Sequence, residues 1–160
     1  MTKAEVTDIL SKLGVRLGFR VGAEVQASDS AWVDVVWFDS RFDFGPVSQA
    51  DQWIKARTWR QPVIPVVGFE IEASAGAKQV KGSVANLANL GATMGVLVLC
   101  EENVKAVRSR AQVHRNESEA AIWKFLLERA TQWVSESRPA GVRVVILTEP
   151  ELKAWAASKT

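Results

Sequence analysis

One stretch, residues 66–90 (VVGFEIEASAGAKQVKGSVANLANL), constrains the fold more than any other part of the chain. It begins as an apolar strand, carries two glutamates near the strand's end, breaks at a run of small residues and continues as a helix. Side chains at positions i and i+2 of a strand leave the same face, so Glu70 and Glu72 point together. Their neighbours Phe69 and Ile71 point to the opposite face. The stretch therefore predicts two carboxylates side by side where a strand gives way to a helix.

Two carboxylates this close raise each other's pKa unless a cation lies between them, and a divalent metal is the simplest such cation. A third acid, Asp34, lies inside the apolar run WVDVVWF of residues 32–38. An unpaired charge in such a strand is costly, so Asp34 needs a partner. If the two strands are neighbours, Asp34 and Glu70 can converge on one ion. We expect a metal site, with hydrolysis of a phosphodiester as the chemistry that such an ion would support.

The composition is that of an ordinary globular protein, with 160 residues, 48% hydrophobic and 24% charged, and we expect one domain over residues 1–160. The net charge of +2 argues neither for nor against a polyanionic partner. The single cysteine, Cys100, excludes an internal disulfide and is expected in the core, which suggests a reducing, cytoplasmic location. No apolar run approaches the roughly 20 residues of a membrane span, so we expect no membrane association.

Hydrophobic periodicity and capping signals give the element order helix, three strands, helix, strand, helix, strand, helix. The expected elements are helices at residues 2–13, 78–90, 116–134 and 148–155, strands at 15–26, 32–38, 63–72, 96–100 and 142–147, and a helical insertion at about 40–62. The first three strands should form a meander, and the helix-linked later strands should be parallel additions. We therefore expect an α/β fold with a central mixed sheet flanked by helices.

This order, together with the three acids, resembles the PD-(D/E)XK nuclease superfamily, which has a restriction endonuclease-like fold. In that family an aspartate on the second core strand and an acid-x-lysine motif on the third bind Mg2+ and activate water. Those positions fall here at Asp34, Glu70 and Glu72. The resemblance implies a nuclease that depends on Mg2+ or Mn2+ and acts on nucleic acid, with DNA as the expected substrate. Val33 stands where the family motif has proline, and Glu72 stands where it has lysine.

The resemblance leaves open what replaces the motif lysine. Glu72 could itself act as a ligand or base, as in members that carry glutamate there. Alternatively, Lys78 or Lys81 could supply the cation from the following helix, and Lys78 lies nearer the strand end. The family's first helix often adds another acid, for which Glu5 is the candidate and Glu24 in the first strand the alternative. Glu5 is equally explained as the third residue of a capping box.

Two basic stretches could supply the positive surface that a phosphate backbone requires. The candidate nucleic-acid contacts are Lys55, Arg57 and Arg60 in the insertion and Lys105, Arg108, Arg110 and Arg115 further along. His114, in the second stretch, is expected to be a surface residue without a catalytic role. A domain of this size would need to form a homodimer to engage both strands of a duplex.

Two other classes of function compete with a nuclease. The glutamate at position 72 would also suit a catalytically inactive member of the same fold that binds nucleic acid or a protein partner. An unrelated α/β enzyme acting on small molecules is disfavoured, because the chain has no P-loop, no G-x-G-x-x-G and no G-x-S-x-G motif.

Overall fold

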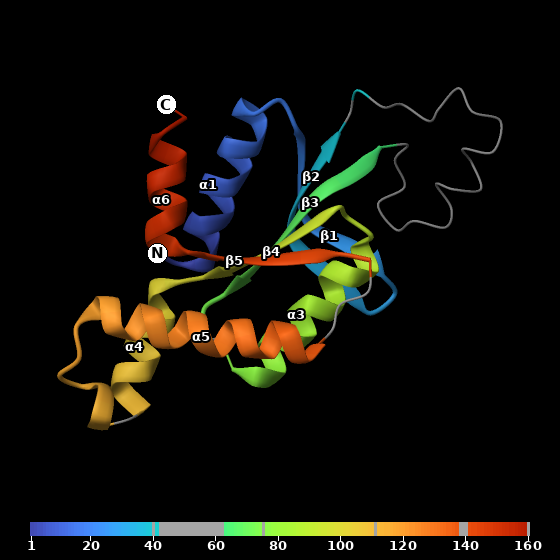
Figure 1. Cartoon of the computed structure of the whole chain (residues 1–160). Helices are drawn as coiled ribbons and strands as arrows, with labels where there is room; N and C mark the ends of the chain where they lie inside the picture. Colours follow the sequence, from blue (N-terminus) through green and yellow to red (C-terminus); the bar gives the residue numbers. More distant parts are fainter. Residues whose placement is uncertain (40, 42–62, 75, 111, 138–140, 160) are drawn as a thin grey trace.

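The computed structural model describes residues 1–39, 41, 63–74, 76–110, 112–137 and 141–159. These residues form three layers, with a five-stranded sheet between two groups of helices (Figure 1). The elements are α1 (Lys3–Arg16), β1 (Arg20–Ser28), β2 (Ala31–Asp39), β3 (Ile64–Glu72), α3 (Ala77–Leu90), β4 (Met94–Leu99), α4 (Glu101–Arg110), the short 3-10 helix η1 (Gln112–His114), α5 (Glu119–Ser137), β5 (Arg143–Thr148) and α6 (Glu149–Ala157).

The sheet has the strand order β1-β2-β3-β4-β5. Strands β1, β2 and β3 are antiparallel neighbours, whereas β4 and β5 join them in parallel. Helix α3 connects β3 to β4, and α4 and α5 connect β4 to β5, as parallel pairing requires. The prediction of an α/β fold with a mixed sheet flanked by helices is therefore confirmed, including the initial meander.

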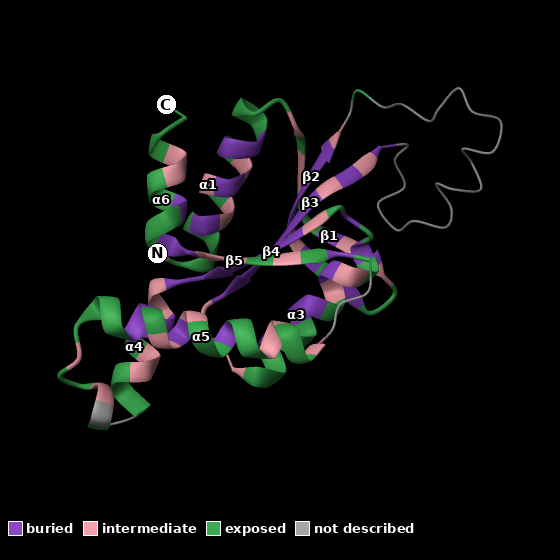
Figure 2. Cartoon of the chain, viewed as in Figure 1, coloured by how far each residue is buried: buried purple, intermediate pink, exposed green. Residues whose placement is uncertain are grey.

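One face of the sheet packs against α1 and α6. Its core contains Val35, Trp37 and Phe69 from the strands and Leu10 from α1. The indole nitrogen of Trp37 donates a hydrogen bond of 3.1 Å to the Leu10 carbonyl, which ties β2 to the middle of α1. Figure 2 shows that the buried residues follow the strands and the inward sides of these helices. This packing fixes the position of α1 relative to the strand that carries Asp34.

The opposite face packs against α3, α4 and α5, with Val80 and Val84 of α3 meeting Ile122 of α5. Gly68 of β3 brings α3 close to the sheet, since a Cβ there would lie 2.7 Å from Leu90 Cδ2. The close approach places α3 directly over the face of β3 from which Glu70 projects.

The structure corrects two boundaries near the N-terminus. Gly14 was expected to end the first helix, but α1 continues to Arg16, and β1 begins at Arg20 rather than at Val15. The reason lies in packing, because a Cβ at Gly14 would meet the Trp37 ring. Gly14 therefore marks a close contact between helix and sheet instead of a helix end.

The predicted element order lacked one helix. The basic stretch of residues 103–115 was not assigned to any helix or strand, yet most of it belongs to α4 and η1. Helix α4 buries only Asn103 and Val104, so it has no apolar stripe that periodicity could detect. The helical insertion expected at about residues 40–62 lies outside the described residues, apart from Arg41.

No helix within the described ranges combines the length and apolarity that crossing a membrane requires.

Candidate functional site

Strands β2 and β3 separate where the three acids lie. Their pairing runs from Asp39 and Ile64 to Val35 and Phe69. Just beyond that last pair, Asp34 Oδ2 accepts a hydrogen bond of 2.8 Å from the Ile71 amide. A side-chain carboxylate thus does what a main-chain carbonyl would do in a continuing ladder. The expectation that the two strands are neighbours is confirmed, and Asp34 is bound to the residue between Glu70 and Glu72.

Glu70 and Glu72 point together toward α3, as the alternation of β3 predicted. Ser83 Oγ donates a hydrogen bond to Glu72 Oε1 and lies 3.5 Å from Glu70 Oε2. Asn86 Nδ2 donates to Glu70 Oε1 at 3.0 Å. Both glutamates are buried, with 6% and 9% of their surface exposed. Sequence reasoning missed Ser83 and Asn86, although polar residues on the buried side of an otherwise apolar helix were a usable signal.

Burial and the charges of neighbouring acids raise the pKa of both glutamates. Burial raises the pKa of Glu70 to about 8, and the negative charges of Asp34 and Glu72 add to this rise. Burial also raises the pKa of Glu72, against the hydrogen bond from Ser83. Glu70 therefore holds a proton at neutral pH, and a cation binding among these groups would release it.

A lysine from α1 supplies the positive charge that the acids face. Lys3 Nζ lies 2.6 Å from Asp34 Oδ1, and the Lys3 side chain is 54% exposed while that of Asp34 is 14% exposed. Burial lowers the pKa of Lys3, but the hydrogen bond to Asp34 and the charges of Asp34, Glu70 and Glu72 outweigh it and raise the pKa. Sequence reasoning missed Lys3. A signal existed, since a lysine in the first turn of a helix opposes the helix dipole.

Lys3 also lines a groove between α1 and β1, with a volume of about 380 Å3. The other lining residues are Ala4, Thr7, Ala23, Glu24 and Asp34. Glu24, the alternative acid from the first strand, thus shares a groove with Asp34.

Among the described residues, Lys78, Lys81 and Glu5 form no ion pair or hydrogen bond with Asp34, Glu70 or Glu72. Lys81 forms an ion pair of 2.7 Å with Glu136 of α5. Lys78 is exposed in the first turn of α3, and it forms no ion pair with any acid in the described part of the chain. Glu5 accepts a hydrogen bond of 2.7 Å from the Thr2 amide within the predicted capping box, which accounts for its position.

The predicted nucleic-acid contacts are only partly described. Lys105 lies 3.6 Å from Glu101 on the same helix, and Arg108, Arg110 and Arg115 are exposed. Lys55, Arg57 and Arg60 lie outside the described residues. The His114 ring nitrogen lies 2.8 Å from Glu117.

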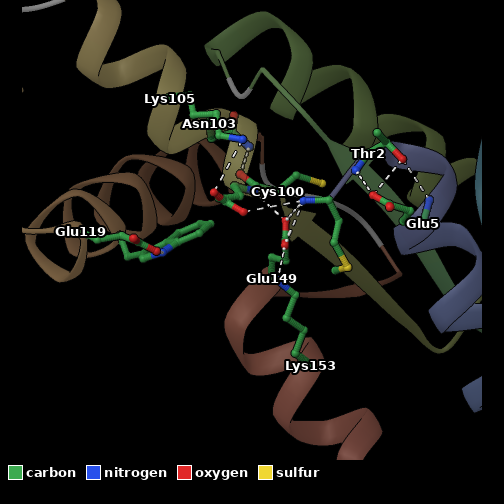
Figure 3. A network of polar contacts seen from close by, with 11 residues as sticks. Thr2, Glu5, Cys100, Asn103, Lys105, Glu119, Glu149 and Lys153 are labelled. Carbon is green, nitrogen blue, oxygen red and sulfur yellow. Dashed lines mark hydrogen bonds and ion pairs between the residues drawn. The ribbon is translucent and has the colours of Figure 1, made fainter.

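A second cluster, of Cys100, Glu102 and Glu149, lies beside the N-terminal residue Met1 and the start of α6, and Figure 3 shows Cys100 and Glu149 of this cluster. It is the one group in the described ranges whose three metal-type donor atoms all lie within 4.8 Å of one another. The charge of Glu149 is already compensated, because Glu149 accepts hydrogen bonds from the Met1 amino group at 3.1 Å and the Glu101 amide at 2.8 Å, whereas Glu102 Oε2 is buried without a hydrogen-bond partner among the described residues. Burial raises the pKa of the Cys100 thiol to about 12, so the thiol is protonated at neutral pH when no metal is bound. Cys100 is a core residue, as expected.

Asp34, Glu70 and Glu72 do not form such a compact three-donor group in this structure, where Lys3 binds Asp34. Their chemistry nevertheless fits Mg2+ or Mn2+, which prefer carboxylate oxygens. The pKa of Glu70 is raised first by burial and then by the negative charges of Asp34 and Glu72, which a cation would offset. These three residues are therefore the donor set that a hard divalent cation would use.

Comparison of the chain with protein-family models, with curated proteins and with solved structures found no match.

Proposed function

We propose that the chain is a nuclease that depends on Mg2+ or Mn2+ and has the restriction endonuclease-like core of the PD-(D/E)XK superfamily. The observation that carries the proposal is the hydrogen bond from the Ile71 amide to Asp34, which brings an acid of β2 against β3 between Glu70 and Glu72. The order from α1 to β4, with a three-stranded meander followed by a parallel strand, supports the same assignment.

Each acid has a role that follows from its contacts. Asp34, Glu70 and Glu72 would hold the metal, which when bound would polarise the phosphodiester and lower the pKa of a water ligand. Asn86 and Ser83 orient Glu70 and Glu72, as hydrogen-bond donors behind metal ligands commonly do. Glu72 serves as a ligand instead of the motif lysine, and Lys3 contributes the positive charge.

The expected partner is nucleic acid, and DNA in particular. The exposed residues Arg108, Arg110 and Arg115 provide positive charge on α4 and the segment that follows it. In this proposal a homodimer would place two such sites on the two strands of a duplex.

Cleavage assays test the proposal. Plasmid, single-stranded and branched DNA, and RNA, would be incubated with Mg2+ or Mn2+ and with wild type, Asp34→Asn, Glu70→Gln or the control Glu136→Gln. Glu136 is a carboxylate with a lysine partner but lies away from the site. Metal-dependent cleavage should be lost in the first two variants and kept in the control. Intact substrates under every condition would reject a nuclease.

One observation favours the inactive binding module as a second candidate. Lys3 already neutralises Asp34, and Glu70 is protonated at neutral pH, so the site is stable without metal. This candidate predicts that metal leaves the melting temperature unchanged, while DNA or a protein partner still binds. It would replace the nuclease if binding occurs without cleavage.

A further inference from the structure

We propose that the groove between α1 and β1 receives the phosphodiester of the substrate and that Lys3 is its cationic contact, which leaves Asp34 when a divalent ion binds. The inference rests on the proposed function for the nature of the substrate. It adds a substrate path and a positioning residue that the three acids alone do not specify.

Lys3 and a divalent metal ion would compete for the same oxygen of Asp34. Lys3 Nζ lies 2.6 Å from Asp34 Oδ1, the oxygen that the Ile71 amide does not use. A divalent ion that binds Asp34 needs an oxygen there, and it repels the ammonium strongly at such a distance. A metal ion and the Lys3 ammonium therefore cannot both bind Asp34 Oδ1 at the same time. Lys3 can move because its side chain is about half exposed to solvent.

The groove between α1 and β1 offers Lys3 a position away from Asp34. The Lys3 side chain already lines the groove, and Asp34 is the one of the three site acids that lines it too. The small side chains of Ala4 and Ala23 leave space in it, and Thr7 adds a hydroxyl group. The charged groups of the lining are Lys3, Asp34 and Glu24. With metal on Asp34, a phosphate in this groove would meet the metal on one side and the Lys3 ammonium on the other.

The backbone beside Asp34 is distorted in both β1 and β2. Val33 and Val35 are two apart in β2 but pack in different cores, and Val21 and Val25, which are four apart in β1, also pack in different cores. In both strands the side chains therefore switch from one face of the sheet to the other at this point. Glu24, which lies between Val21 and Val25 in β1, has a φ of 49°, a left-handed value that is unusual for glutamate. Strained residues of this kind concentrate at functional sites, where the surrounding structure holds them. Both Glu24 and Asp34 line the groove at this distortion.

The test compares wild type, Lys3→Gln and Lys3→Arg with the control Lys12→Gln. Lys12 lies on the same helix and makes an ion pair of the same length, 2.6 Å, with Asp8. Calorimetry with Mn2+ on the protein without nucleic acid measures competition. Removing Lys3 should tighten metal binding about threefold to tenfold, because a competing charge is lost, while Lys12→Gln should leave it unchanged. Unchanged or weaker metal binding in Lys3→Gln would reject competition.

A second measurement addresses the phosphate contact. Binding of a short fluorescein-labelled DNA oligonucleotide would be followed by anisotropy over a range of salt, with Ca2+ as the bound ion. Lys3→Gln should weaken binding and lower the salt slope by about 1, as expected for one lost phosphate contact, and Lys3→Arg should restore both. An unchanged slope would reject Lys3 as the phosphate contact.

A variant without a charge change probes the groove itself. Ala23 is an exposed strand residue that lines the groove, so Ala23→Phe should fill the groove without disturbing the core. It should weaken oligonucleotide binding and leave Mn2+ affinity unchanged. Normal oligonucleotide binding would reject the groove as the substrate path.

These results are separable from the nuclease assay. If wild type cleaves DNA but the Lys3 and Ala23 variants bind metal and oligonucleotide normally, the inference fails and the nuclease stands. If no preparation cleaves but all the expected binding changes occur, the nuclease fails and the groove stands as a phosphodiester-binding site.

Discussion

The carboxylate of Asp34 accepts a 2.8 Å hydrogen bond from the backbone amide of Ile71, at the point where β2 and β3 cease to pair. Its other oxygen faces Lys3 at 2.6 Å. Each oxygen therefore has a partner, which explains why an acid is tolerated in such an apolar strand. The same contact determines the separation of Asp34 from Glu70 and Glu72.

This contact predicts different stabilities for two substitutions of Asp34. Asp34→Ala leaves the Ile71 amide without its acceptor and should lower the free energy of unfolding by about 1–3 kcal/mol. Asp34→Asn keeps an acceptor oxygen and should cost less. Urea denaturation of the metal-free proteins measures both. Asp39→Ala, at an exposed ion pair on the same strand, is the control and should have a smaller effect than Asp34→Ala. Equal losses in the two Asp34 variants would show that the hydrogen bond contributes little.

Glu70 predicts how the stability of the metal-free protein depends on pH. Its pKa rises from 4.5 to about 8 on folding, chiefly through burial, so the folded state binds the proton more tightly than the unfolded state. The favourable contribution is complete below about pH 4.5 and disappears as the pH rises through about 8, a change on the order of a few kcal/mol at most. Glu70→Gln stays neutral and should lack this decline. Urea denaturation over that pH range tests the prediction, and parallel curves for the two proteins would contradict it.

Asn86 should tune metal binding through Glu70. Its side chain donates to Glu70 Oε1 and lowers the pKa of that carboxyl against the effect of burial. Asn86→Ala should therefore raise the pKa of Glu70 further and weaken Mn2+ binding at neutral pH by about tenfold. The matched control is Asn89→Ala, an exposed asparagine on the same helix. Calorimetry compares the two, and a similar affinity in both variants would separate Asn86 from the metal site.

Local patterns predicted those parts of the site that depend on local geometry. Alternation along β3 placed Glu70 and Glu72 on one face because the two residues share one strand. Lys78 was chosen for its nearness in sequence, whereas the lysine that reaches Asp34 is Lys3 of α1. Only the packing of α1 on the sheet brings these two together. That contact is a property of tertiary structure, and the position of Lys3 in the first turn of a helix does not by itself indicate which acid it meets.

The same distinction explains the errors in the fold. The side chains of β2 change face between Val33 and Val35, and the apolar run of residues 32–38 gave no alternation that could indicate this change. A left-handed residue at Glu24 on the neighbouring strand accompanies the change, and glutamate gives no warning of such a conformation. Helix α4 was missed because most of its surface is polar. In each case, contacts between elements outweighed the local pattern.

Gly14 and Gly82 provide a final prediction about how α1 is held in place. Both glycines lie inside helices, where alanine is favoured by about 1 kcal/mol. A Cβ at Gly82 would have nothing within 4 Å, so Gly82→Ala should stabilise the protein by up to about that amount. A Cβ at Gly14 would meet the Trp37 ring and lie 2.7 Å from Val21 Cγ2. Trp37 cannot easily retreat, because it is hydrogen-bonded to Leu10 and stacked on Phe19 at 5.4 Å.

Gly14→Ala should therefore destabilise the protein by about 1–3 kcal/mol despite its better helix propensity. It should also shift α1 and so disturb the contact between Lys3 and Asp34. Thermal denaturation measures the stability of the two alanine variants, and Mn2+ calorimetry measures the effect on the site. Stabilisation of both variants would mean that α1 packs less closely on Trp37 than the structure indicates. Destabilisation of Gly14→Ala with tighter Mn2+ binding would link the packing of α1 to the competition between Lys3 and metal.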